Sequence, residues 1–70
     1  MNIELIKNEI ENHLNERVVI EVYGMRNKNF KYEGTIKSAY PYLFTVEIDG
    51  TQKSFNYADL ITGDVVVKYL

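Results

Sequence analysis

Five cationic side chains fall between residues 17 and 37 and are the first candidates for a binding surface. They are Arg17, Arg26, Lys28, Lys31 and Lys37. Clustered cations can contact phosphates or an acidic protein partner. Glu21 and Glu33 lie among them, which favours a simpler interpretation, a solvated sheet face whose charges discourage pairing with other strands.

Aromatic side chains beside these cations suggest a second kind of contact, the stacking of unpaired bases. Tyr32 and Tyr40 share a predicted strand face with Phe30, which places them in the core or at its rim. Tyr23 and Tyr42 are predicted to be exposed. Because the chain is acidic overall, protein contact is favoured over base stacking, and tyrosine suits such contact since it buries a large area.

Residues 54–59 gather hydroxyl, amide and carboxylate groups but lack the parts of a catalytic site. Ser54 has no histidine within sequence reach, and His13 lies on the predicted inward stripe of a helix. Asp59 is expected to cap a short helical turn or to accept backbone amides. With no cysteine and one histidine, a zinc site is unsupported. We predict no catalytic residue, no metal and no cofactor.

The first element that must position these groups is a helix over about residues 2–14. Its apolar stripe is formed by Ile3, Ile6, Ile10, His13 and Leu14, with Leu5 widening it. Asn2 can accept from free amides of the first turn, so it is a candidate N-cap. Asn15 is a candidate helix stop because asparagine tolerates the left-handed conformation.

After the helix, alternation with period 2 predicts five strands over residues 17–23, 30–40, 43–49, 51–56 and 65–69. Residues 24–29 are expected to form a loop, and Asp49-Gly50 is a two-residue hairpin signal. Gly34 lies on the inner face of the longest strand, where it admits a bend and the close approach of a neighbour. One helical turn is expected at 57–61.

These elements predict a mainly β fold, an N-terminal helix followed by a five-stranded SH3-like or Sm-like small barrel with one short helical turn before the last strand. The 70 residues form one domain, 1–70, with the helix at about 2–14 and the barrel at about 17–70. Edge strands and a small core make self-association a possible supplement to stability.

Charge is unevenly distributed along this chain of net charge −2. Residues 1–16 carry four glutamates and one lysine, whereas residues 17–53 carry six cations and four carboxylates. The N-terminal stretch lacks the basic start and apolar run of a signal peptide. No stretch approaches the roughly 20 apolar residues that cross a bilayer, so a cytoplasmic protein without membrane contact is expected.

Two segments of the second half resemble the Veg family of Firmicute bacteria. Residues 40–44, YPYLF, resemble its YPxxF segment, and residues 54–62, SFNYADLIT, resemble its SYSYAD(V/I)LT segment. A valine-rich end follows at 64–67, and Asn15 stands where the family has glycine. The family-motif residues, expected to be structural, are Tyr40, Pro41, Phe44, Ser54, Tyr57 and Asp59. The resemblance implies a small cytoplasmic regulatory protein that stimulates biofilm formation by opposing a transcriptional repressor.

We therefore predict a non-enzymatic regulatory module that acts on transcriptional control through contact with another protein, with a transcriptional regulator as a candidate partner. The candidate partner or phosphate contacts are Arg17, Gly24, Arg26, Lys28, Lys31 and Tyr42. One alternative is a nucleic-acid-binding protein of Sm-like or SH3-like type. The other is a homo-oligomeric structural protein.

Overall fold

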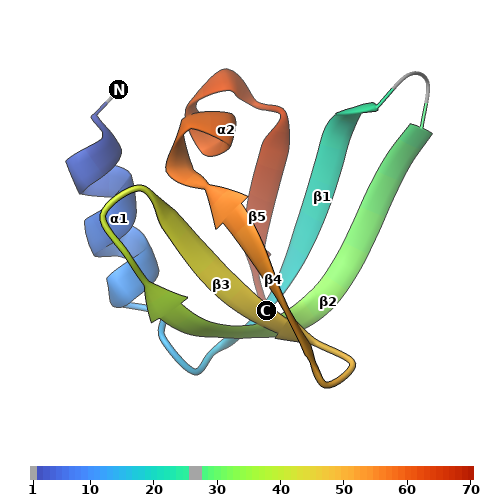
Figure 1. Ribbon diagram of the computed structural model, residues 1–70, viewed down its shortest axis with the longest axis horizontal. Coiled ribbons are helices and arrows are strands. Elements are labelled where there is room, and N and C mark those ends of the chain that lie inside the picture. The colour runs from blue at the N-terminus through green and yellow to red at the C-terminus, as the bar shows by residue number, and fades with distance from the viewer. Residues whose placement is uncertain (1, 26–27) are drawn as a thin grey trace.

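The computed structural model describes residues 2–25 and 28–70, which form a single curved sheet flanked by two helices (Figure 1). The elements in chain order are α1 (Ile3–Glu11), β1 (Arg17–Met25), β2 (Lys28–Ala39), β3 (Leu43–Ile48), β4 (Thr51–Asn56), α2 (Tyr57–Thr62) and β5 (Val65–Tyr69). All strand pairs are antiparallel, in the order β4-β3-β2-β1-β5. The predicted mainly β fold is confirmed, with its leading helix and its short helix before the last strand.

The long strand β2 gives the sheet its curvature because it is shared between two neighbours. Its first part pairs with β1 as far as Thr35, and its last part pairs with β3 from Thr35 onward. β4 and β5 lie at the two ends of the strand order, and α2 connects them. This arrangement, with a helical turn before the last strand, is typical of SH3-like and Sm-like barrels.

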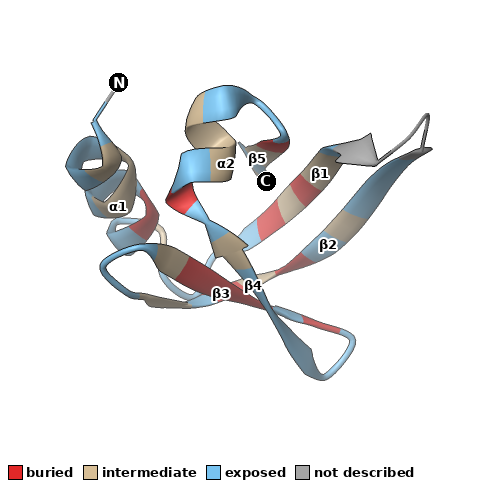
Figure 2. Ribbon diagram, turned by 45° about the horizontal axis from the view of Figure 1, so that its top comes forward, coloured by how far each residue is buried: buried red, intermediate tan, exposed pale blue. Residues whose placement is uncertain are grey.

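Alternation places the core on the concave face of the sheet, as predicted for β1 and β3. Val18 and Ile20 are fully buried on β1, and Phe44 and Val46 are fully buried on β3. Ile10 of α1 and Tyr57 of α2 complete the core from outside the sheet, and Figure 2 shows the buried positions concentrated where sheet and helices meet. The two helices therefore cover one part of the concave face and leave the rest to the strands.

Gly34 fills the inner position at which β2 approaches β3 most closely. A Cβ atom built there would overlap the carbonyl oxygen of Glu47 and lie 2.8 Å from side-chain carbons of both Val46 and Ile48. The predicted close approach of a neighbour at this glycine is confirmed.

The prediction that Tyr40 shares the inner face of Ile36 is wrong. The ladder pairs Ile36 with Val46 but Ser38 with Thr45, so one extra residue of β2 interrupts the register. This β-bulge shifts the alternation by one position, because side chains change face with every residue. Ala39 takes the inner position opposite Phe44, and Tyr40 is half exposed.

The helix is shorter than the predicted 2–14, since α1 ends at Glu11. Asn2 is its N-cap, as predicted, and its side chain accepts from the amide of Glu4 at 2.9 Å. The chain must leave the helix early because the amide of Asn15 donates to the carbonyl of Ile36 at 2.7 Å. Asn15 has the predicted left-handed conformation, with φ of 68°.

Two further predictions for the helix are wrong. Leu14 lies beyond the helix and Leu5 lies on its outer side, so both are exposed rather than part of the packed stripe. Ile3 and Ile6 do pack against the core with Ile10. No helix within residues 2–25 and 28–70 has the length and apolar character that crossing a membrane requires.

The turns of the sheet agree with the predictions at one end and differ at the other. Asp49 and Gly50 both have positive φ, 51° and 80°, as the predicted two-residue hairpin requires. The predicted loop at 24–29 is shorter, because β1 continues to Met25 and β2 begins at Lys28. Arg26, one of the predicted contacts, lies outside the described residues.

Candidate functional site

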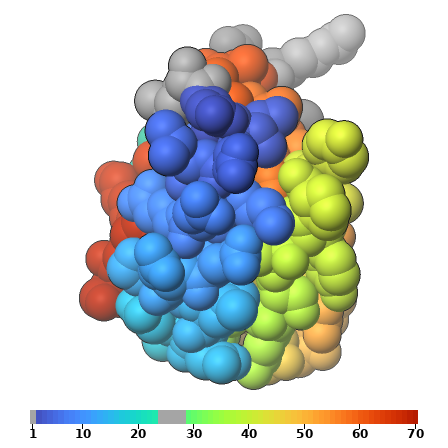
Figure 3. Space-filling view, turned by 90° about the vertical axis from the view of Figure 1, so that its left-hand side faces the viewer, coloured from blue at the N-terminus to red at the C-terminus, as the bar shows by residue number. Residues whose placement is uncertain are grey.

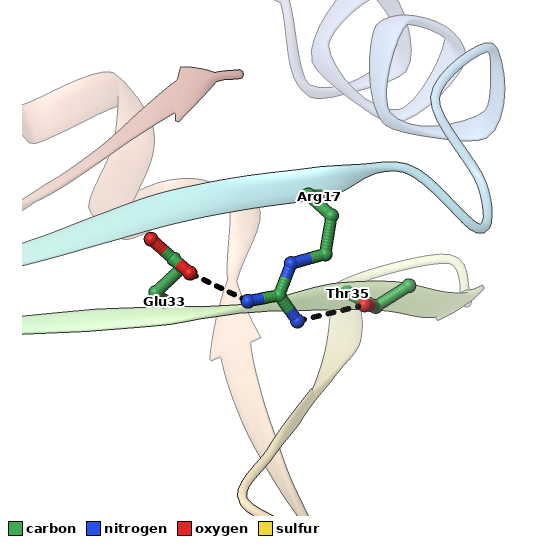
Figure 4. A network of polar contacts seen from close by, with 3 residues as sticks. All are labelled: Arg17, Glu33 and Thr35. Atoms are coloured by element: carbon green, nitrogen blue, oxygen red, sulfur yellow. Dashed lines mark hydrogen bonds and ion pairs between the residues drawn. The ribbon is translucent and has the colours of Figure 1, made fainter.

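The predicted cation Arg17 lies on the outer face of the sheet and is engaged by neighbours on β2. Its Nη2 atom is 2.6 Å from Oε2 of Glu33, and its Nη1 atom donates to the hydroxyl of Thr35 at 3.5 Å (Figure 4). The ladder brings these side chains together because Arg17 pairs with Thr35 across β1 and β2. Both members of the ion pair are more than half exposed, so it contributes little, on the order of 0–1 kcal/mol.

The predicted cation Lys31 is also paired, through a carboxylate shared by two lysines. Glu21 on β1 lies 3.7 Å from Nζ of Lys31 on β2 and 3.0 Å from Nζ of Lys68 on β5. The hydrogen bond from Lys68 lowers the pKa of Glu21, and the same contact raises the pKa of Lys68. On the outer face, cations and carboxylates of neighbouring strands therefore form ion pairs.

Those predicted contact residues that the structure describes are not gathered into one patch. Gly24 and Lys28 belong to the ends of β1 and β2, Arg17 and Lys31 are ion-paired along the sheet, and Tyr42 lies between β2 and β3. The interspersed carboxylates therefore have the effect expected from the sequence, which is a solvated face of mixed charge.

Tyr42 is the most exposed aromatic side chain among the described residues, with 75% of its surface accessible. It follows Tyr40, which is 50% exposed, and Pro41, which is also exposed. We call residues 40–42 the aromatic turn. Its backbone is held at both ends, since the amide of Tyr40 donates to the carbonyl of Leu43 at 2.8 Å and the amide of Tyr57 donates to the carbonyl of Tyr42 at 3.1 Å.

The aromatic turn belongs to a surface that also includes α1. Figure 3 shows α1, in blue, between the segment around the β2–β3 turn and the last strand. Leu5 of α1 is 65% exposed, which adds an aliphatic side chain to the exposed apolar residues of the molecule. Tyrosine is among the residue types that are enriched in protein interfaces and at their hot spots.

His13 and Tyr69 connect the turn after α1 to the last strand. The two rings stack with centroids 3.9 Å apart, and Nδ1 of His13 lies 2.9 Å from Oε1 of Glu16. Burial, with Glu9 and Glu16 nearby, raises the pKa of Tyr69 to about 12. His13, which was predicted on the inward stripe of the helix, therefore lies beyond its end and makes a stacking and hydrogen-bonding contact.

The described part of the chain forms hollows on its surface, and we consider two that were not predicted from the sequence. One of about 210 Å³ lies between α1, α2 and β5, and its lining is apolar apart from Glu9. The other, of about 390 Å³, lies between β4 and the β1–β2 hairpin and includes Lys53 and Phe30 in its lining. The signal for the second was present in the alternation, which places Lys53 on the same face as Phe55.

Comparison with protein families decides the relationship that the motifs indicated. The family described as biofilm formation stimulator VEG matches residues 1–68 of the 70-residue chain. The chain belongs to the Veg family. No curated protein matches it.

Two of the six Veg motif residues, Phe44 and Tyr57, belong to the core. Phe44 and Tyr57 are fully buried and stack with ring centroids 5.7 Å apart. Burial, with Glu11 nearby, raises the pKa of the Tyr57 hydroxyl. Ser54, by contrast, is exposed on β4.

The Veg motif residue Asp59 does not cap α2 with its side chain as expected. The hydrogen bonds at this position go to its backbone carbonyl, from the amide of Gly63 and the hydroxyl of Thr62. The N-cap is Asn56, whose side chain makes no capping bond.

Within residues 2–25 and 28–70, no three histidine or acidic side chains form a metal-binding group.

Proposed function

We propose that this member of the Veg family is a non-enzymatic regulatory module that acts on transcriptional control by binding another protein through its aromatic turn. The observation that carries the proposal is the 75% exposure of Tyr42 on a backbone held by two hydrogen bonds. A side chain displayed in this way contributes contact area to a partner at little ordering cost. The family description, biofilm formation stimulator, supports a regulatory role.

Capture of a partner from bacterial lysate tests this function with one substitution and one matched control. Tyr42→Ala removes the most exposed tyrosine, while Leu70→Ala removes an equally exposed apolar side chain at the C-terminus. We expect Tyr42→Ala to lose the captured protein and Leu70→Ala to retain it, with both variants as stable as the wild type. Equal capture by all three proteins would refute the role of the aromatic turn.

Nucleic-acid binding of Sm-like type is the less favoured proposal. Phosphate contact requires available cations, whereas Arg17 and Lys31 are paired with Glu33 and Glu21. A gel-shift titration with single-stranded RNA and duplex DNA at low salt checks this. A salt-sensitive shift at micromolar protein would favour nucleic acid over protein contact.

Self-association is a second candidate function, favoured by the two end strands of the sheet. β4 and β5 each pair with one neighbour in the described chain and leave one edge available for another strand. Light scattering across a concentration series measures this directly. A mass that stays at one chain over the whole series would exclude a homo-oligomeric structural protein.

A further inference from the structure

A groove between β4 and the β1–β2 hairpin combines aromatic walls with the charge of Lys53. Its lining residues are Val22, Phe30, Tyr32, Lys53, Ser54 and Phe55. The volume of about 390 Å³ lies within the range of roughly 300–1,000 Å³ that ligand pockets occupy. None of the six residues belongs to the predicted contact set.

The apolar walls of this groove remain accessible. The Phe30 and Tyr32 rings stack with centroids 6.3 Å apart, and Phe30 is 38% exposed. Across the groove, Phe55 is partly buried against Phe44, with ring centroids 5.8 Å apart. An apolar side chain entering between the two walls would meet aromatic carbon on both sides.

Among the described residues of the lining, Lys53 is the only one that carries a charge. Its ammonium lies 5.1 Å from the centroid of the Tyr32 ring, a cation–π arrangement that holds the charge over the groove. The ion pairs formed within residues 2–25 and 28–70 do not include Lys53, unlike Arg17, Lys31 and Lys68. The groove therefore complements a negatively charged group that carries an apolar neighbour.

The strand beside the groove adds a way to bind extended chain. β4 is the last strand in the sheet order and pairs with β3 alone among the described strands. A peptide added to such an edge gains main-chain hydrogen bonds, and alternate side chains point to the same face. Lys53 and Phe55 occupy alternate positions of β4 on the groove side, so they would meet alternate side chains of the added strand.

We propose that this groove binds an extended acidic peptide segment of a partner protein, with an aromatic or aliphatic side chain between Tyr32 and Phe55 and a neighbouring carboxylate on Lys53. The inference rests on the proposed protein-binding function and specifies the chemistry of the partner. Single-stranded nucleic acid fits less well, because the described part of the lining offers one lysine and hence one phosphate contact.

Selection from a random twelve-residue peptide library tests the proposal, using wild type, Lys53→Glu and the matched control Lys37→Glu. Lys37 is exposed on β2 and lies outside the groove lining, so its variant makes the same charge change elsewhere. We expect wild type and Lys37→Glu to enrich peptides that place Asp or Glu beside an aromatic or aliphatic residue. Lys53→Glu should bind those peptides about tenfold more weakly and select basic residues instead.

Amide NMR spectra with an enriched peptide then locate the binding, and the largest shifts are expected at Phe30, Tyr32 and Phe55. The proposal is refuted if no acidic peptide is enriched, or if Lys53→Glu selects the same peptides as wild type. It is also refuted if the amide shifts lie at other residues, or if single-stranded RNA binds more tightly at the same residues. If the groove fails while capture from lysate still depends on Tyr42, the protein-binding function stands without it. If peptides bind as expected but Tyr42→Ala retains capture, only the aromatic turn is refuted.

Discussion

The imidazole of His13 and the phenol ring of Tyr69 stack with their centroids 3.9 Å apart and an interplanar angle of 23°. This contact joins the turn after α1 to β5, two segments at opposite ends of the chain. It also places the Tyr69 hydroxyl near Glu9 and Glu16, whose negative charges oppose its ionisation after burial has already disfavoured it.

Alkaline pH should destabilise the protein through Tyr69. Its pKa is raised from about 10 in the unfolded chain to about 12 in the folded one, so the folded state binds the proton more tightly. The resulting stability is fully present below pH 10 and is lost as pH rises through 12. Tyr69→Phe keeps the ring but cannot ionise, so its urea midpoint should fall less between pH 9.5 and 11.5. If the urea midpoints of wild type and Tyr69→Phe fall equally over this pH range, the role of Tyr69 is contradicted.

Glu21 should contribute to stability above acid pH. Its pKa is lowered in the folded state, chiefly by the hydrogen bond from Lys68, so its contribution is present above the unfolded pKa and is lost as pH falls through the folded value. Glu21→Gln removes this charge, and we expect its urea midpoint to fall less than that of wild type between pH 6 and pH 3. An identical acid dependence in the two proteins would contradict the role of the Lys68 contact.

Gly34→Ala should destabilise the fold by about 1–3 kcal/mol, since the added methyl group has no space between β2 and β3. Gly50→Asn is the matched control, because Gly50 has a φ of 80° with nothing near its Cβ position and asparagine tolerates that conformation. Urea unfolding of both variants measures the difference. Equal stability of wild type and Gly34→Ala would show that the strands do not approach as closely as described.

Local patterns predicted the elements well where one residue decides the backbone. Asn2, Asn15 and the Asp49-Gly50 pair each have the conformation expected from their side chains. Alternation likewise predicted the buried apolar positions of β1 and β3, but not Thr45, which is also buried although it points to the other side of β3.

Predictions that depended on long-range contacts were less successful. The bulge after Ile36 moved Tyr40 out of the inner face, and the backbone bond from Asn15 to Ile36 ended α1 three residues before the predicted end. Neither effect has a local signature. Both arise because the α1–β1 connection and β3 meet β2 at the same place.

The candidate contact residues were predicted from residue type alone. The fold pairs some of these cations with carboxylates, which makes them less available to a partner. The sequence shows Arg17 and Glu33 sixteen positions apart, but the register of β1 and β2 brings them within 2.6 Å. Lys53 was not predicted as a contact, because no other cation is near it in the sequence. Only the folded sheet places it over Tyr32 beside two aromatic walls.

Photo-crosslinking from position 42 tests the central claim most directly. A benzoylphenylalanine at position 42 reports what touches the aromatic turn in living cells, and the same probe at position 49, on the exposed β3–β4 hairpin, serves as the control. We predict that position 42 yields one discrete protein adduct that resists nuclease and is absent from position 49. Adducts that disappear on nuclease treatment, or an identical pattern from both positions, would contradict the account.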